Sequence, residues 1–455
     1  MLRDGDRDEW IRLLQSGFDQ LEAGFAGLPE FAAATALGGA VAGSLDGFAA
    51  VIGEAARRLG DNYPYFHPLY AGQMLKPPHP VAQAAYALAM AINPNNHARD
   101  GGRASSEMEI EAVAGIAAMM GWRAEHGFLG HLTSGGTFAN LEALWVAGQV
   151  MPGRRVVASE QAHYTHKRIT SVLKIPFGEV RSDDRGRMDL EALEDELRRG
   201  DVGTVVATLG TTAMGAVDPL DGILALRERY GFRLHVDAAY GGYFRLIGAA
   251  LGEAAARAFA RIDEADSIVI DPHKHGLQPY GCGCVLFRDA GVGRYYKHES
   301  PYTYFTSSAL HLGEISLECS RAGASAVALW ATQRLMPLVE LDEPGDEFAR
   351  GLALGRRAAV ELNQRLQADE RFEAFPGGPE LDIVVWRAVG AAERAQEVFD
   401  RAAELDLHLA LVHLPRRYFE AGASGMTSCL RSVLMKPEHA TWLPEIWKRL
   451  DQAAS

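Results

Sequence analysis

The stretch Asp271-Pro272-His273-Lys274-His275-Gly276 lies between two apolar runs, Ser267-Ile268-Val269-Ile270 and Gly283-Cys284-Val285-Leu286-Phe287. Each run is typical of a strand, so the pattern predicts that Lys274 lies on a short turn at the end of a strand, in buried surroundings. Burial disfavours the charged form of a lysine, so its pKa tends to fall and its amine becomes a nucleophile. A lysine in a polar surface turn is the commoner case, but the sequence upstream favours the nucleophile.

A second apolar run, upstream, ends in an acid: Leu234-His235-Val236-Asp237-Ala238-Ala239-Tyr240-Gly241-Gly242. A nucleophilic amine is how proteins hold pyridoxal phosphate (PLP), and PLP needs an anion beside its pyridinium nitrogen because the protonated ring is the electron sink. Asp237 suits that role, and Ala239 is small enough for a flat ring to lie against the backbone. Asp237 is also a plausible helix N-cap, and the two interpretations are compatible.

A seat for the phosphate group is predicted by Ser134-Gly135-Gly136-Thr137, which leads directly into an apolar-periodic helix. Free backbone N–H groups and the positive end of a helix bind anions, and Thr137 adds a hydroxyl. A Gly-Gly turn before a helix is usually only a turn. The motif therefore indicates a phosphate site only together with the other motifs.

Two more polar groups follow apolar runs. His163 comes after Val156-Val157-Ala158-Ser159 and is placed to stack on a cofactor ring, although a lone loop histidine is more often solvated. Thr212 ends a run that begins at Thr204, where its hydroxyl can bond to the cofactor or to Asp237. Ligands bind at the carboxyl ends of strands in open parallel sheets, which is where these groups are expected.

The motifs Ser134-Gly135-Gly136-Thr137, Gln161-Ala162-His163, Leu209-Gly210-Thr211-Thr212, His235-Val236-Asp237-Ala238-Ala239-Tyr240 and Asp271-Pro272-His273-Lys274 resemble, in order and spacing, the group II PLP-dependent amino-acid decarboxylases. That family includes the glutamate, aromatic amino-acid and archaeal tyrosine/aspartate decarboxylases. The resemblance covers most of the chain, from about residue 60 to about residue 440. It implies an α/β protein of PLP-dependent transferase fold type I, similar to aspartate aminotransferase, with a mainly parallel sheet in a large domain and a small α+β C-terminal domain.

The resemblance also implies a role for each matching residue. Lys274 would form the Schiff base with PLP, and His273 would lie beside the reacting carbon. The other residues implied to contact the cofactor are Gly136, Thr137 and either Asp271 or Ser307 near the phosphate, and His163, Thr212, Asp237 and Ala239 around the ring. An ionised Asp271 cannot donate to phosphate, whereas the Asn common at this position in eukaryotic members can.

Substrate contacts are predicted in two regions. Arg431 matches the arginine that holds the substrate carboxylate in glutamate decarboxylases, a task that suits a guanidinium fork; a surface ion pair is the alternative. The polar residues His67, Gln73 and Asn95 fall in a loop-rich region that contributes to the substrate pocket in the family, and each is also explained as a turn residue.

The aromatic segment 295–308 is predicted to be a loop. In the family a mobile loop near this position carries the tyrosine that donates a proton to the carbanion, and phenylalanine there accompanies oxidative deamination. Tyr302 and Tyr304 are the candidates, with Phe305 adjacent. An aromatic patch at a dimer interface is the alternative interpretation.

Composition narrows the class of protein. The net charge of −14 over 455 residues, without a Lys/Arg run, argues against nucleic-acid binding. Four cysteines do not make a disulfide framework. The charged start, residues 1–8, is unlike a signal peptide, and residues 32–56 are too weakly apolar for a membrane span. A cytoplasmic enzyme with no membrane or nucleic-acid partner is expected.

Three parts are predicted along the chain. Residues 1–85 form a helical segment that in family members packs on a partner subunit; residues 86–343 form the large PLP-binding domain; and residues 344–455 form the small domain, after Glu343-Pro344-Gly345-Asp346. In the small domain we expect a helix over 348–366 and strands at 383–386, 407–411 and 430–434. A homodimer with its active site near the subunit interface is expected from the family.

The sequence therefore predicts a PLP-dependent decarboxylase that converts an L-amino acid into an amine and CO2 through Lys274. Another PLP reaction on the same scaffold, either aldehyde-forming oxidative deamination or carbon–carbon lyase chemistry, stays open. A more distant alternative is a metal hydrolase built on the pairs His163/His166, His235/Asp237 and His273/His275. These pairs lack the spacing of metal ligands on one helix, so no metal site is predicted.

Overall fold

The structure is a computed structural model that describes residues 4–27, 45–99, 101–123, 125, 127–297, 316–340, 343–391 and 393–455. The chain divides into two compact units, residues 1–70 and residues 71–455. Each unit is considered by itself.

Two helices make up the regular structure of the N-terminal unit, α1 (Asp4–Ala23) and α2 (Leu45–Leu59). The predicted N-terminal helix is thus present, and its helical spacing places Trp10, Leu14 and Phe18 on one half-buried side. Many apolar side chains of this unit are exposed: Ile11, Leu13, Phe25, Phe48, Val51, Ile52 and Leu59.

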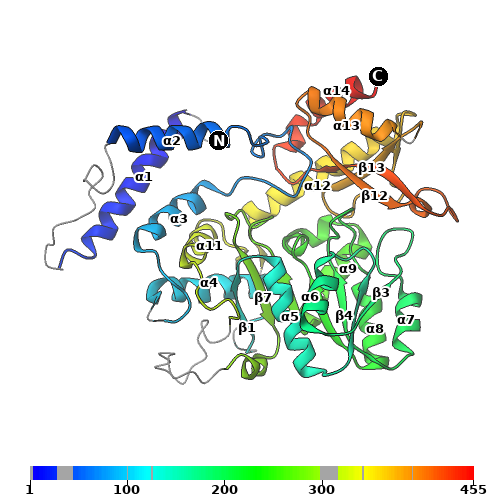
Figure 1. The fold of residues 1–455 in the computed structure, drawn as a ribbon, viewed down its shortest axis with the longest axis horizontal. Coiled ribbons are helices and arrows are strands. Elements are labelled where there is room, and N and C mark those ends of the chain that lie inside the picture. Colours follow the sequence, from blue (N-terminus) through cyan, green and yellow to red (C-terminus); the bar gives the residue numbers. More distant parts are fainter. Residues whose placement is uncertain are drawn as a thin grey trace. The chain divides into compact units, whose positions relative to one another are not determined.

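A seven-stranded sheet forms the centre of the second unit (Figure 1). Its strands, in their order across the sheet, are β1 (Leu129–Thr133), β7 (Gly283–Phe287), β6 (Ser267–Ile270), β5 (Arg233–Asp237), β4 (Val202–Thr208), β2 (Arg155–Ser159) and β3 (Phe177–Val180). Strands β6, β5, β4, β2 and β3 run parallel, and β7 is antiparallel to both its neighbours. Every residue of β4, β6 and β7 is buried, as expected for strands covered on both faces.

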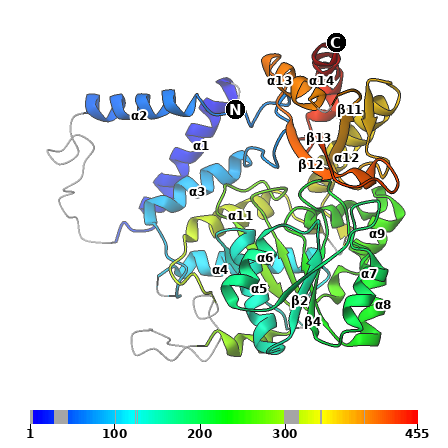
Figure 2. The same cartoon turned by 45° about the vertical axis from the view of Figure 1, so that its right-hand side comes forward.

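Helices connect and cover these strands (Figure 2). They are α3 (Pro80–Ile92), α4 (Arg103–Met119), α5 (Gly136–Val150), α6 (Thr165–Leu173), α7 (Leu190–Leu197), α8 (Leu220–Tyr230), α9 (Glu253–Ala260) and α11 (Gly323–Leu335), with short 3-10 helices η2 (Gly242–Ala250), η3 (Ile262–Glu264) and η4 (Ala290–Tyr295). Helix α5 packs on β6 and β7 and beside α6, and α7 packs beside α8. The parallel strands therefore alternate with crossover helices, which aligns their carboxyl ends at one edge.

The C-terminal part is a four-stranded antiparallel sheet with three helices, α12 (Asp346–Gln367), α13 (Arg394–Glu404) and α14 (His439–Ala454). Its strands, in sheet order, are β10 (Phe372–Ala374), β11 (Ile383–Ala388), β13 (Met426–Val433) and β12 (Ala410–Pro415), and η5 (Arg416–Tyr418) follows β12. A two-stranded ribbon, β8 (Val339–Glu340) and β9 (Glu343–Pro344), precedes α12. Figures 1 and 2 show the three helices grouped with this sheet.

The mainly parallel sheet and the smaller C-terminal α+β part are as predicted from the sequence. Two details differ. The strand expected over 407–411 begins only at Ala410, because residues 405–407 still form the turn that ends α13. The short edge strand β10 was not predicted, since three residues carry too little periodicity to be recognised. The division at residues 85 and 343 stays a prediction.

No helix in the described ranges combines the length and the apolarity that a bilayer crossing requires.

Candidate active site

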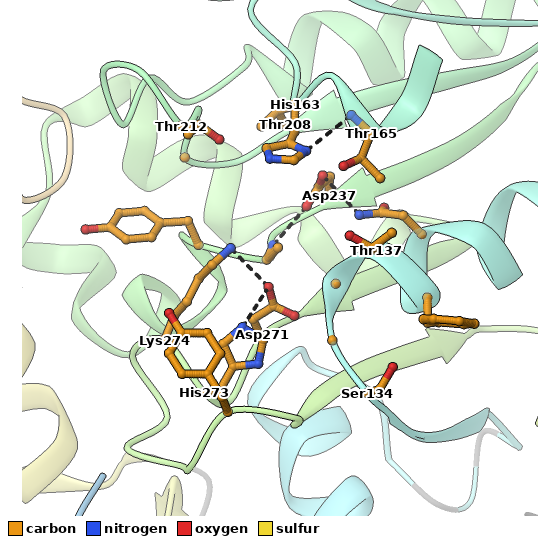
Figure 3. A pocket seen from close by; sticks show the side chains of 18 residues that line it. Ser134, Thr137, His163, Thr165, Thr208, Thr212, Asp237, Asp271, His273 and Lys274 are labelled. Carbon is orange, nitrogen blue, oxygen red and sulfur yellow. Dashed lines mark hydrogen bonds and ion pairs between the residues drawn. The ribbon is translucent and has the colours of Figure 1, made fainter. Parts of the chain in front are cut away.

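A cavity of about 310 Å³ opens at the carboxyl ends of the parallel strands (Figure 3). It is lined by Ser134, Gly135, Gly136, Thr137, Phe138, Asn140, His163, Thr165, Thr208, Gly210, Thr212, Asp237, Ala239, Tyr240, Asp271, His273, Lys274 and Tyr280. Nine of the ten residues predicted to contact the cofactor are in this set, and the tenth, Ser307, lies outside the described residues. The volume falls in the range of small-molecule sites.

The N-terminus of α5 forms one wall of the cavity. Its N-cap, Gly135, supplies no side-chain hydrogen bond, so the N–H groups of the first helical turn, at Gly136 and Thr137, have no capping side chain. These amides and the helix dipole present a positive surface to the cavity.

The carboxylate of Asp271 packs directly against that helix end. A methyl group added at Gly136 would lie 2.7 Å from Oδ2 of Asp271, so only glycine allows this approach. The same Oδ2 lies 3.0 Å from Nζ of Lys274. Asp271 is 3% exposed, and the two side chains form a largely buried ion pair (Figure 3). The predicted turn thus holds the lysine amine inside the cavity.

Asp237, the last residue of β5, presents an ionised carboxylate to the cavity. Burial works against ionisation, but a 2.8 Å hydrogen bond from Nε2 of His166 and a 3.0 Å bond from the N–H of Ala239 hold the pKa of Asp237 well below its usual range. An ionised carboxylate only accepts hydrogen bonds, so Nε2 of His166 carries the proton.

Asp237 is also held by a network of hydrogen-bonding side chains that the sequence did not reveal. The amide nitrogen of Asn140 donates to Oδ2 of Asp237 at 3.3 Å, and the amide oxygen of Asn140 lies 2.8 Å from Nε2 of His235. The other ring nitrogen of His235 lies 2.9 Å from the hydroxyl of Ser267. Burial, reinforced by the charge of His166, lowers the pKa of His235 to about 3, so its ring is neutral. A polar residue at 140, about one turn after Thr137 in the same helix, was the available signal.

Two histidines border the cavity. Burial lowers the pKa of His163, and its Nδ1 accepts a 3.2 Å hydrogen bond from the N–H of Thr165, which fixes a neutral ring in one orientation. Burial also lowers the pKa of His273, whose ring lies 4.6 Å from that of Tyr280. Tyr280 is 59% exposed, so it stands at the mouth of the cavity.

Arg431 and Gln73 come together next to the cavity. The guanidinium of Arg431 donates to the carbonyl of Thr212 at 2.8 Å, to the carbonyl of Gly72 at 3.1 Å and to Oε1 of Gln73 at 2.8 Å. Thr212 lines the cavity. Two of the predicted substrate residues are therefore neighbours, although 358 positions separate them.

The remaining predicted residues lie elsewhere. The side chain of Asn95 accepts from the N–H groups of His97 and Arg321 and donates to Ser320, and it does not line the cavity formed by the described residues. His67 belongs to the N-terminal unit, where its Nδ1 accepts from the N–H of Leu69. Tyr302, Tyr304 and Ser307 lie outside the described residues.

The pairs considered for a metal site do not form one. Across the described ranges, no three histidine, cysteine, aspartate or glutamate side chains lie in an arrangement that could hold a metal ion. His166 and His235 contact Asp237 and Asn140 instead.

The donor set of the cavity fits PLP. The uncapped end of α5 suits a phosphate, the amine of Lys274 suits an aldehyde, and the ionised Asp237 suits a pyridinium nitrogen. The buried Oδ1 of Asp271, which has no hydrogen-bond partner among the described residues, faces the same helix end. This negative charge opposes a phosphate there.

Comparison with known proteins gives the same result. The family described as the pyridoxal-dependent decarboxylase conserved domain matches residues 62–389. A probable L-tyrosine/L-aspartate decarboxylase of Methanothermobacter thermautotrophicus is 30% identical over 361 residues, which are 76% of this chain and 89% of that protein. An L-tyrosine decarboxylase of Enterococcus faecium is 28% identical over 460 residues, which are 74% of this chain and 72% of that protein.

Two solved structures share the fold. The crystal structure of mouse CSAD has a TM-score of 0.73 at 22% identity and covers 86% of this chain and 84% of its own. That of Oryza sativa TDC with PLP and tryptamine has a TM-score of 0.77 at 17% identity and covers 100% of this chain and 98% of its own. The fold predicted from the sequence is confirmed.

Proposed function

Since this chain belongs to the pyridoxal-dependent decarboxylase family and is a carboxy-lyase that uses PLP, we propose that it converts an L-amino acid into the corresponding amine and CO2, with the cofactor held covalently by Lys274. The observation that carries the proposal is that the amine of Lys274 and the ionised carboxylate of Asp237 line one cavity at the carboxyl ends of β6 and β5 (Figure 3). These are the two groups that PLP chemistry requires.

PLP, when bound, supplies a protonated ring that accepts the electron pair left by the departing carboxylate. In this proposal Asp237 keeps the proton on the ring nitrogen, and the network through His166 and Asn140 keeps Asp237 ionised. His163 would present a neutral imidazole to the ring, and Ala239 would pack against it. Gly136 and Thr137 bind the phosphate through the end of α5.

Further residues are assigned to the substrate. Arg431 binds a substrate carboxylate, with Gln73 holding the guanidinium in place at 2.8 Å. His273 lies beside the reacting atoms, where its position under Tyr280 shields it from solvent. His67 and Asn95 stay candidates for reading the substrate side chain, and Tyr302 or Tyr304 for the proton donor.

The experiment that tests the proposal is product analysis by mass spectrometry, with PLP-loaded protein and single amino acids. L-Tyrosine and L-aspartate, which appear in the names of the relatives, come first. An amine equal to the substrate minus CO2 supports the proposal. An aldehyde with ammonia would instead establish oxidative deamination, and a product of carbon–carbon cleavage would establish a lyase.

Covalent attachment needs its own control. Borohydride reduction of the loaded protein should leave PLP on the peptide that contains Lys274, and the Lys274→Ala variant should retain none after denaturation. PLP fixed to another lysine would overturn the assignment of Lys274 while leaving decarboxylation open.

We also propose that the enzyme is a cytoplasmic homodimer. The exposed apolar side chains of the N-terminal unit support a partner, because large exposed apolar surfaces are rare on soluble monomers and mark interaction sites. A monomeric mass in analytical ultracentrifugation would contradict the dimer.

A further inference from the structure

A buried carboxylate outside the cavity, that of Asp382, joins the four-stranded sheet to the cofactor site. Asp382 directly precedes β11, and its backbone carbonyl accepts a 2.9 Å hydrogen bond from the N–H of Leu434 at the end of β13. Only 1% of Asp382 is exposed. The four-stranded sheet therefore fixes the position of this carboxylate.

The two oxygens of Asp382 face two different segments of the cavity wall. Oδ1 accepts a 2.6 Å hydrogen bond from the hydroxyl of Tyr240, and Oδ2 lies 3.4 Å from Nε2 of His275. Tyr240 follows Ala239 in the chain, and His275 follows Lys274. One carboxylate thus spans the two segments that carry the acid and the amine of the site.

The ring of His275 is packed between aromatic side chains and lies against the carboxylate of Asp382. It packs edge-to-face against Tyr240 at 4.8 Å and Phe244 at 5.0 Å, and in the described part of the chain neither of its ring nitrogens has a hydrogen-bond partner. Burial, helped by the charge of Lys76, lowers the pKa of His275 well below its usual range. The ring is neutral, so it does not neutralise Asp382.

Asp382 changes its protonation state at a mildly acidic pH. Burial raises the pKa of Asp382 to about 6, against the opposing effects of the Tyr240 hydrogen bond and of the positive charges of Lys76 and, from α12, Arg356. Arg431 faces Tyr240 from β13. The carboxylate is therefore ionised at neutral pH and protonated under mildly acidic conditions.

On the basis of the proposed function, we propose that Asp382 is a positioning residue of this active site. Its ionised carboxylate holds Tyr240 by a hydrogen bond and lies against the ring of His275, and in this way it keeps the adjacent Ala239 and Lys274 in the arrangement that binds the cofactor. Protonation weakens that hold, because a neutral carboxyl group is a poorer acceptor than a carboxylate.

The test compares PLP affinity in the wild type and in Asp382→Asn between about pH 5 and pH 8, by titration of the apo-protein in the absence of substrate. Asn mimics the protonated carboxyl in shape and charge. The variant should bind PLP about tenfold more weakly than the wild type at pH 8, the loss expected for one charge-assisted hydrogen bond, and equally well at pH 5. A ratio of the two dissociation constants that is the same at every pH would overturn the proposal.

Two tyrosine variants separate positioning from packing. Tyr240→Phe deletes the hydrogen bond through which Asp382 acts, so it should weaken PLP binding at pH 8 about as much as Asp382→Asn does and reduce the pH dependence of the affinity. Tyr418→Phe is the matched control, because Tyr418 is equally buried and its hydroxyl also joins the two sheets, through Ser182, away from the cavity. It should leave the affinity and its pH dependence unchanged.

If Tyr418→Phe weakened PLP binding as much as Tyr240→Phe, the effect would come from hydrogen bonds between the two sheets in general, and the proposed role of Asp382 would be wrong. These measurements use no amino acid. A failure of the decarboxylation assay would therefore leave their outcome intact, and loss of borohydride trapping at Lys274 would reveal a failure of the proposed site separately.

Discussion

Replacing the carboxylate of Asp237 by an amide should reduce turnover while leaving PLP bound. Asp237→Asn keeps the size of the side chain and an oxygen that can accept from the N–H of Ala239 at the present 3.0 Å. It removes the negative charge that the hydrogen bond of His166 stabilises. The perturbation is therefore one of charge rather than of packing.

The magnitude follows from the electrostatics of a buried pair. At an effective dielectric constant of about 20, two opposite unit charges about 4 Å apart attract by about 4 kcal/mol. Each 1.36 kcal/mol corresponds to about tenfold in rate, so kcat should fall by about 10²- to 10³-fold. Asp237 is only 5% exposed, and solvent therefore screens this attraction weakly.

The assay is kcat at saturating PLP, with cofactor content measured in parallel by alkaline release. His166→Phe keeps the negative charge of Asp237 but removes the side chain that donates a hydrogen bond to it. This variant should lower kcat by about ten- to a hundredfold, which is the effect expected from loss of a hydrogen bond to a charged group. Asp218→Asn serves as control, because Asp218 is a fully buried carboxylate that binds the N–H groups of Met188 and Thr208. A kcat for Asp237→Asn within about threefold of the wild type, at full PLP content, would refute the role of Asp237.

Three further outcomes are expected. Gly136→Ala should lose most PLP affinity, because the new methyl group would lie 2.7 Å from the carboxylate of Asp271; equilibrium titration with PLP checks this. Burial raises the pKa of Asp218 to about 7, so the folded state loses stability as the pH rises from about 4 through 7. In urea unfolding between about pH 5.5 and pH 8, the free energy of unfolding of the wild type should fall by about 2 kcal/mol more than that of Asp218→Asn. Of the four thiols, only the exposed Cys319 should react rapidly with a disulfide reagent in the native protein, because Cys282, Cys284 and Cys429 are buried and burial raises the pKa of each well above its usual range; fast labelling of more than one thiol would contradict the structure.

The sequence predicted the positions of Lys274 and Asp237 because both follow short apolar runs. Such runs form buried parallel strands, and parallel strands end at a common edge, so residues far apart in the chain are expected together. The same reasoning placed His163 and Thr212, and the structure puts all four around one cavity. It did not predict that β7 runs antiparallel to β6, because the direction of a strand leaves no mark in its own periodicity.

The groups that tune the site could not be predicted in this way. Asn140 and His235 lie on different elements, and nothing in their local sequence shows that they meet beneath Asp237. Asp382 was not singled out at all, because an acid before a strand is ordinary and only its 2.6 Å contact with Tyr240 gives it meaning. The pairing of Arg431 with Gln73 likewise requires the four-stranded sheet to be folded against the cavity.

The sequence by itself therefore determined the class of fold and the cofactor, and it predicted the lysine that would carry the cofactor, since these depend on residue type, strand periodicity and motifs that resemble a known family. Only the tertiary structure decided which carboxylates are ionised and which side chains hold them. The physical reason is that burial and hydrogen bonding set the charge of Asp237 and Asp382, and both depend on neighbours that come from distant parts of the chain.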